Sequence, residues 1–595
     1  MAPWPTCETG PLEASDADCF ALSSARVVLP CDAECLFEVV PATVVVVRGV
    51  IAAVFRPGDA VALPPGCEVR DCGAHVVFPG VVDAGARFGE CAGAGPRSAS
   101  DCWEGFERGT RAAAAGGITC TLPEDDRYRT SRLLAAFPGG GGGDPLPLLL
   151  NAVQLTTEEL EASSPFRLLA PGTREDAQSP LMLLPLCQVD DDDDGGGPAA
   201  AADAAPPPDD DDWAAPRGPR PRQARLERLF GEKEEGTWVK NLLQAELESY
   251  QMSGSATTSE PASGPSTARS PVAASLLDQA PLRKPNPRRP PAIKIFKEND
   301  RHTRRAIRKE YSLYCDGHPS AAGAIGLEAA LDAAASLDDG GGASACGLSL
   351  HVAKVSTLQT ARVLHDAQAH EDACAAAGTR RLFGDLSGSV ALYHLTHCEE
   401  AVPHGATVHK VSPPIRHEAH RRALWSALQN GTVAVVTSGH APGDPRGKLR
   451  ESGDFLRAAH GTLAGANELL LPVLWSAART NGYGLGALAV WLSFGPAKLL
   501  NLASDRGLID VGFRADFVIF DADRDWTVDA SKLQGVDGDV LDGIPEKKRE
   551  KRLAAACLFH GHECSGKVLA TLLRGRLTYR EGRFRTAPHG EVVAR

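Results

Sequence analysis

The sequence predicts a (β/α)8 barrel joined to a small sheet domain that is built from both ends of the chain. Helix-like and strand-like segments alternate after residue 320. This alternation implies a parallel sheet with crossover helices, most simply a closed barrel. β-rich runs occupy residues 26–77 and return after about residue 503. We therefore expect the two ends of the chain to form a sheet domain beside the barrel.

The first β-rich region consists of short runs separated by turns: "ARVVLP", "ATVVVVRGVIAAVF" and "CEVRDCGAHVVFPG". Every residue of Thr43–Val47 is β-branched, which favours a buried strand. At the other end, "RGLIDVGFRADFVIFDADRDWTV" and "GKVLATLLRGRLTYREGRF" have the same character.

The expected barrel elements begin with a helix from about Trp103 to Ala115, which Gly116 and Gly117 should end, followed by a strand over Ile118–Leu122. Later, "GLSLHVAKVS" predicts a strand and "TLQTARVLHDAQAH" a helix. "HRRALWSALQNG" and "TVAVVTSGHAP" repeat this helix and strand order.

Residues 188–310 differ from both halves, because they contain aspartate runs, a Ser/Thr/Pro segment and a basic run. This composition predicts a largely disordered insertion. The expected division is therefore 1–75 and 504–595 for a β-sandwich, 76–187 and 311–503 for the barrel, and 188–310 for the insertion.

The overall charge and composition indicate a cytoplasmic globular protein. The net charge of −14 is inflated by the insertion, where ten of the 76 acidic residues lie in one tract. The remainder gives no reason to expect nucleic-acid binding. The sixteen cysteines show no CxxC pair, which favours reduced thiols. No apolar run is long enough for a membrane helix, and the N-terminus has no signal-peptide pattern.

Several motifs in the expected order resemble the cyclic amidohydrolases, namely dihydroorotase, hydantoinase and allantoinase. "FPGVVD" and "GLIDVGFRADFVIFD" are similar to motifs of the whole group. "WEGFERGTRAAAAGGIT", "KVSPPIR", "LPVLWSAARTNGYGL" and "GHECSGKVLATLLRGRLTY" most resemble allantoinase. The match covers roughly 25–135 and 345–580. It implies an amidohydrolase-type (β/α)8 barrel with a β-sandwich formed from both chain termini.

The resemblance also implies a pair of divalent metals, of the zinc type, that activates water to attack a cyclic amide. The family's histidine pair aligns with Gly85 and Arg87, a further histidine aligns with Lys354, and the aspartate aligns with Gly439. Glycine has no side chain, and a guanidinium cannot ligate. The bridging lysine should lie near Leu148, but the first lysine in the chain is Lys233. We therefore predict no bound metal, no cofactor and no intact catalytic set.

Other residues keep family-like positions. The resemblance makes Pro414, Arg416 and His440 candidates for substrate binding. Two groups of residues have side chains of the types that bind metals. One group is His351, His394, His397 and His440, and the other is Cys557, His560, His562 and Cys564 in "CLFHGHEC". Structural roles are commoner for such residues, and we favour them.

These observations support three hypotheses for the function. The first is an allantoinase-like hydrolase that opens the ring of allantoin to allantoate in purine catabolism. The second is a non-catalytic binding or assembly subunit, as in the collapsin response mediator proteins. The third is an incorrect gene model through residues 140–345. The family implies a small cyclic ureide as ligand and a homo-oligomer, a dimer or tetramer, without nucleic-acid or membrane partners.

Overall fold

The structure is a computed structural model of the chain. It describes residues 12, 16–31, 36–87, 104–123, 181–185, 311, 314–315, 318, 320–336, 348–379, 381–443, 445–450, 452–461, 465–535, 557–585 and 589–591. The predicted insertion, the glycine run at 139–143 and Leu148 lie outside the described residues.

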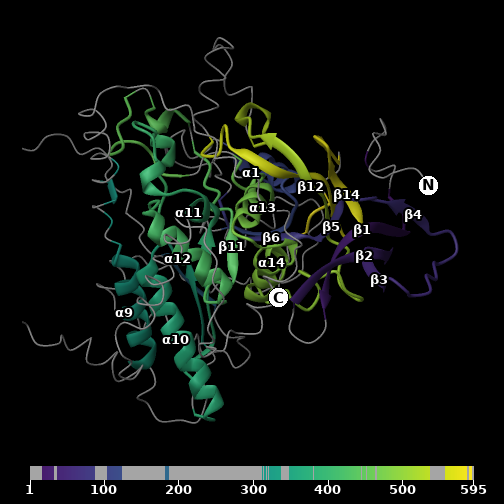
Figure 1. Ribbon diagram of the computed structural model, residues 1–595, viewed down its shortest axis with the longest axis horizontal. Helices are drawn as coiled ribbons and strands as arrows, with labels where there is room; N and C mark the ends of the chain where they lie inside the picture. The colour runs from purple at the N-terminus through teal and green to yellow at the C-terminus, as the bar shows by residue number, and fades with distance from the viewer. Residues whose placement is uncertain are drawn as a thin grey trace, which may run out of the picture.

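Both ends of the chain contribute to one nine-stranded sheet. Its central seam is antiparallel, where β5 (Val76–Pro79) pairs with β12 (Phe517–Thr527). The order is β15-β14-β13-β12-β5-β1-β2-β3, with β4 paired to β1. The expectation that the two terminal regions share a sheet is confirmed, and Figure 1 shows the purple and yellow strands side by side. The other strands are β1 (Cys19–Cys31), β2 (Leu36–Val47), β3 (Val50–Phe55), β4 (Glu68–Asp71), β13 (Glu563–Leu573), β14 (Arg576–Arg580) and β15 (Arg583–Phe584).

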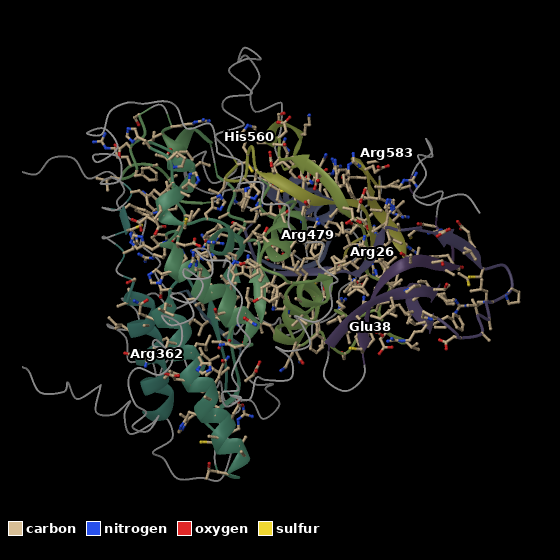
Figure 2. All side chains as sticks on the ribbon, viewed as in Figure 1. Arg26, Glu38, Arg362, Arg479, His560 and Arg583 are labelled. Atoms are coloured by element: carbon tan, nitrogen blue, oxygen red, sulfur yellow. The ribbon has the colours of Figure 1, made fainter. Side chains whose placement is uncertain are left out.

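Apolar side chains explain why this seam forms. Val77 and Ile519 lie opposite each other in the register, and both are fully buried. The β-branched run in β2 also buries Val44 and Val46 in the same core. Arg26 of β1, which is labelled in Figure 2, adds an ion pair between the two strands that flank β5, since its Nη1 lies 2.7 Å from Asp523 Oδ2 of β12.

A second set of strands is parallel. β6 (Val81–Ala86) pairs with β7 (Ile118–Pro123). β8 (Leu181–Pro185), β9 (Leu348–Ala353), β10 (Phe383–Ala391) and β11 (Val435–Thr437) form a four-stranded sheet in that order. A parallel bridge between Ala86 and His440 joins β6 to the end of β11. The first parallel strand thus lies beside the last, as closure of a barrel requires.

Helices alternate with these strands. The helix predicted near residues 103–115 is α1 (Gly105–Ala115), and Gly117 follows it in the left-handed region at φ +85°. The other helices are α9 (Ala322–Ser336), α10 (Leu358–Ala376), α11 (Leu392–Thr396), α12 (Glu418–Gln429), α13 (Leu470–Thr480), α14 (Leu485–Ala489), η7 (Val490–Phe494) and α15 (Gly495–Leu499). Single turns are η4 (Glu399–Ala401), η5 (Thr407–His409), η6 (Pro445–Lys448) and η8 (Ala530–Lys532). None of the described helices has both the length and the apolarity to span a bilayer.

The histidines considered for an alternative metal site include His351 on β9, which is a buried structural residue. It is 1% exposed, and its Nδ1 lies 2.9 Å from Ser387 Oγ of the neighbouring strand. Burial lowers the pKa of His351 from 6.5 to about 3. The folded protein therefore keeps this imidazole neutral at pH values where the unfolded chain protonates it.

We predict that His351 contributes to acid sensitivity. The unfolded chain binds one more proton here than the folded protein between pH 6.5 and about pH 3. Stability should therefore fall as the pH decreases through this window, by up to about 1.4 kcal/mol per pH unit. Thermal melts between pH 7.5 and 4.5 should show a shallower decline for His351→Gln than for the wild type. Parallel declines would contradict the prediction.

Candidate functional site

The four positions predicted to correspond to the family's metal ligands lie at the carboxyl ends of parallel strands. Gly85 is the second-last residue of β6, and Arg87 follows that strand. Lys354 follows β9, and Gly439 lies two residues beyond β11. The carboxyl ends of parallel strands share one rim, where barrel active sites are built. The structure thus places all four positions on the same rim.

A buried carboxylate joins the first and last strands at this rim. Asp83 Oδ1 on β6 accepts hydrogen bonds from the backbone N–H groups of Ser438, at 3.1 Å, and Gly85, at 3.2 Å. Asp83 Oδ2 accepts from the Ser438 hydroxyl. Burial raises the pKa of Asp83, and these hydrogen bonds act in the opposite direction. The turn that carries Gly439 is therefore held against β6.

Gly439 is a sterically closed position. Its backbone has φ +59°, and a Cβ placed there would lie 2.6 Å from Tyr393 Cε1 and 3.0 Å from Ala391 Cβ. The ring of Tyr393 is itself buried, and its hydroxyl donates to Ser412 O at 3.0 Å. The space that an aspartate side chain would need is thus filled by a fixed aromatic ring.

Beside Gly439, His440 pairs with a carboxylate that the sequence analysis did not identify. His440 Nε2 lies 2.6 Å from Glu104 Oε2, and both side chains are fully buried. Glu104 immediately precedes α1 and belongs to the "WEGF" motif. The motif marked Glu104 as family-like, but nothing in the sequence joined it to a histidine 336 residues away. A carboxylate at this distance orients an imidazole and fixes its tautomer.

Lys354 and His394 add to the polar character of the rim. Lys354 has φ +52°, and its N–H donates to Ser389 Oγ at 3.4 Å. Burial lowers the pKa of His394, the positive charges of Arg416 and Lys354 act in the same direction, and together they bring it to about 3. His394 Nε2 donates to Pro413 O at 3.0 Å, so the "SPPIR" segment docks onto the end of β10.

The candidate binding residues Pro414 and Arg416 lie in that docked segment, and both are buried. Arg416 is 6% exposed, and its Nη1 donates to Cys315 O at 3.3 Å. The structure thus brings Arg416 and Lys354 to the surroundings of His394. His440 immediately follows Gly439, where a built Cβ would meet the Tyr393 ring.

These residues do not fit a pair of divalent metals. Gly85 supplies no ligand atom, Arg87 and Lys354 bring positive charge, and the carboxylate position at Gly439 is filled. Among the described residues, no group of three or more His, Cys, Asp or Glu side chains is arranged to hold a metal ion. The "CLFHGHEC" residues have other contacts, since His560 Nδ1 accepts from Ala530 N at 3.1 Å and Cys564 is buried.

Comparison with known sequences identifies one matching family model and several relatives that are named as allantoinases. Residues 331–578 match the model of the Amidohydrolase family. A protein of rice named Probable allantoinase is 26% identical over 578 residues, which cover 97% of this chain and 91% of that protein. The allantoinase of Arabidopsis thaliana is 32% identical over 34% of this chain. Probable allantoinase 2 of Dictyostelium discoideum is 34% identical over 32% of it. The chain spans about a third of these last two relatives, 36% and 34% of their lengths.

Solved structures show the same fold. Dihydropyrimidinase from Brevibacillus agri has 18% sequence identity and a TM-score of 0.53, with 95% of this chain and 96% of that chain covered. D-hydantoinase from Bacillus sp. AR9 has 19% identity and a TM-score of 0.51 over the same shares. At these identities the likeness concerns the fold alone, a TIM barrel of the hydantoinase type.

We predict that Gly439→Ala is strongly destabilising. The new Cβ would collide with Tyr393 in a backbone conformation that L-residues avoid, at an expected cost of about 2–4 kcal/mol. Gly431→Ala is the matched control, because Gly431 has φ +81° with no atom within 4 Å of its built Cβ. That variant should lose only about 1 kcal/mol. Chemical denaturation should separate the two, and equal losses would contradict the packing explanation.

Proposed function

We propose that this chain is an allantoinase-type protein that binds a cyclic ureide but does not catalyse its metal-assisted hydrolysis. Its residues 331–578 match the model of the Amidohydrolase family. Its allantoinase relatives in rice and Arabidopsis support the ligand class. The replacement of the ligand residues supports the loss of metal chemistry. By descent the ligand would be allantoin, the substrate of purine catabolism that the sequence motifs imply.

The observation that carries this proposal is the packing at Gly439. A missing carboxylate alone would leave a space that water or a neighbouring acid could use. Here Tyr393 occupies that space, and the left-handed backbone disfavours any side chain. Metal-assisted hydrolysis needs a bound water whose pKa is lowered to about 7. The described rim residues offer no ligand set for that purpose.

The competing function is an active allantoinase. The relative from rice favours it, because the match extends over 97% of this chain. A binding or assembly role agrees better with the rim residues. We further propose a cytoplasmic homo-oligomer, a dimer or tetramer, on the basis of the family resemblance and the reduced-thiol pattern of the sequence.

We predict that the purified full chain contains no stoichiometric zinc, cobalt or manganese. It should show no allantoin hydrolysis when each metal is added, because the attacking water keeps a pKa near that of bulk water. Elemental analysis and an allantoate assay on one sample test both points. The allantoinase of Streptomyces avermitilis, 34% identical over 34% of this chain, serves as the positive control. Binding of metal together with conversion of allantoin to allantoate would overturn the proposal.

A further inference from the structure

We propose that Cys19 and Cys67 form an oxidisable thiol pair, which peroxides convert into an intrachain disulfide. The pair lies in the nine-stranded sheet, where Cys19 begins β1 and Cys67 immediately precedes β4. Figure 1 shows β4 on the opposite side of the molecule from α9 and α10. This modification site therefore belongs to the sheet domain, and it is independent of the ligand in the proposed function.

The strand register places the two cysteines next to each other. β1 and β4 are parallel neighbours, and Phe20 pairs with Glu68 in their register. Cys19 and Cys67 immediately precede these two partners, so the same register sets them side by side. Neighbouring strands lie about 4.8 Å apart, and side chains in register point to the same face. A disulfide needs Cα atoms about 4.4–6.8 Å apart, which this spacing satisfies.

The surroundings of Cys67 show independently that the two thiols are in contact. Burial raises the pKa of the Cys67 thiol, a hydrogen bond with the Cys19 side chain and the charge of Cys19 act in the same direction, and the pKa reaches about 11. A hydrogen bond between two thiols requires their sulfur atoms to be neighbours. Both side chains are half-buried, so a small oxidant has access to them.

The backbone around the pair is fixed on the β4 side. The Cys67 N–H donates to Pro64 O at 3.1 Å. Arg70 donates from Nε and Nη2 to the two oxygens of Glu68, each at 3.1 Å. The guanidinium of Arg70 also lies 4.3 Å from the centre of the Phe20 ring on β1. These contacts hold the start of β4 against β1, so the disulfide forms without movement of the strands.

Two other cysteine environments provide a comparison. The charge of Cys564 acts on Cys557, but both of these side chains are buried. Cys374 is half-buried like Cys19, and its Sγ lies 3.6 Å from Nε2 of His370. Cys374 is therefore a matched control, because its exposure is similar and its contact is an imidazole rather than a thiol.

The oxidation balances in two steps. The Cys19 sulfur attacks hydrogen peroxide, the O–O bond breaks, and a sulfenic acid and one water molecule form. The Cys67 sulfur then attacks the Cys19 sulfur, the S–O bond breaks, and the thiol proton leaves with the hydroxide as a second water molecule. Two thiols thus lose two electrons and two protons to one peroxide. Cys19 attacks first, because the raised pKa keeps Cys67 protonated at neutral pH.

Peptide mapping of the full chain tests the disulfide. The reduced protein is treated with a stoichiometric amount of hydrogen peroxide at neutral pH, alkylated, and digested without reductant. We expect a linked peptide pair that contains Cys19 and Cys67 and disappears after treatment with dithiothreitol. Cys374→Ser should give the same pair, whereas Cys19→Ser and Cys67→Ser should give none. Alkylation of both cysteines in the wild type, or linkage of either one to another cysteine, would overturn the inference.

Trapping with dimedone tests the order of attack. Cys67→Ser retains the thiol that attacks first, so Cys19 should collect the label as its sulfenic acid. In Cys19→Ser, burial still disfavours the Cys67 thiolate, and labelling should be at least about tenfold slower. Faster labelling of Cys67 than of Cys19 would contradict this order.

Thermal melting tests whether the linkage fits the native strands. A disulfide between Cys19 and Cys67 closes a long loop, so the oxidised wild type should melt a few degrees above the reduced protein. Cys374→Ser should keep this difference, and Cys67→Ser should lose it. An equal or lower Tm after oxidation of the wild type would contradict the fixed geometry on which the inference depends.

Discussion

The contact between Asp83 and Ser438 is the interaction on which the rim depends. It joins two residues that are 355 positions apart through two hydrogen bonds to one buried carboxylate, which also accepts a third from the Gly85 N–H of its own strand. The same turn is fixed by the bridge from Ala86 to His440 and by the Arg87 N–H, which donates to His440 O at 2.7 Å. Because β6 and β11 are held in this register, Gly85, Gly439 and His440 have defined positions. Loss of the carboxylate would leave buried donors without partners, which costs more than an ordinary surface change.

The residues at and beside the predicted ligand positions make defined contacts with one another. Tyr393 fills the space beside Gly439, and Glu104 pairs with His440 in a fully buried contact. Arg416 and Lys354 place positive charge near His394. In the proposed function, these fixed positive charges stand where the family's resemblance implies dications.

Much of the fold could be predicted from the sequence, because it follows from local patterns. The β-branched run at Thr43–Val47 and the paired glycines after α1 are local signals, and both lie where expected. The identity of Gly439 was also evident from "TSGHAP". The ring beside it was not, because packing of Tyr393 depends on the path of β10 and not on any spacing in the sequence. Likewise, Arg416 was singled out as a residue, while its burial and its hydrogen bond to Cys315 O depend on the fold around it.

The seam between β5 and β12 has a consequence for synthesis of the chain. The register places Phe517 opposite Pro79, so one edge of β5 has no partner until the chain is nearly complete. At translation rates of about 5–20 residues per second, the intervening segment of roughly 440 residues takes about 20–90 s to make. During that interval the N-terminal strands present an apolar edge, with Val77 and Phe78 exposed to other chains. Completion of the nine-stranded sheet is therefore a late event that depends on contacts of high sequence separation.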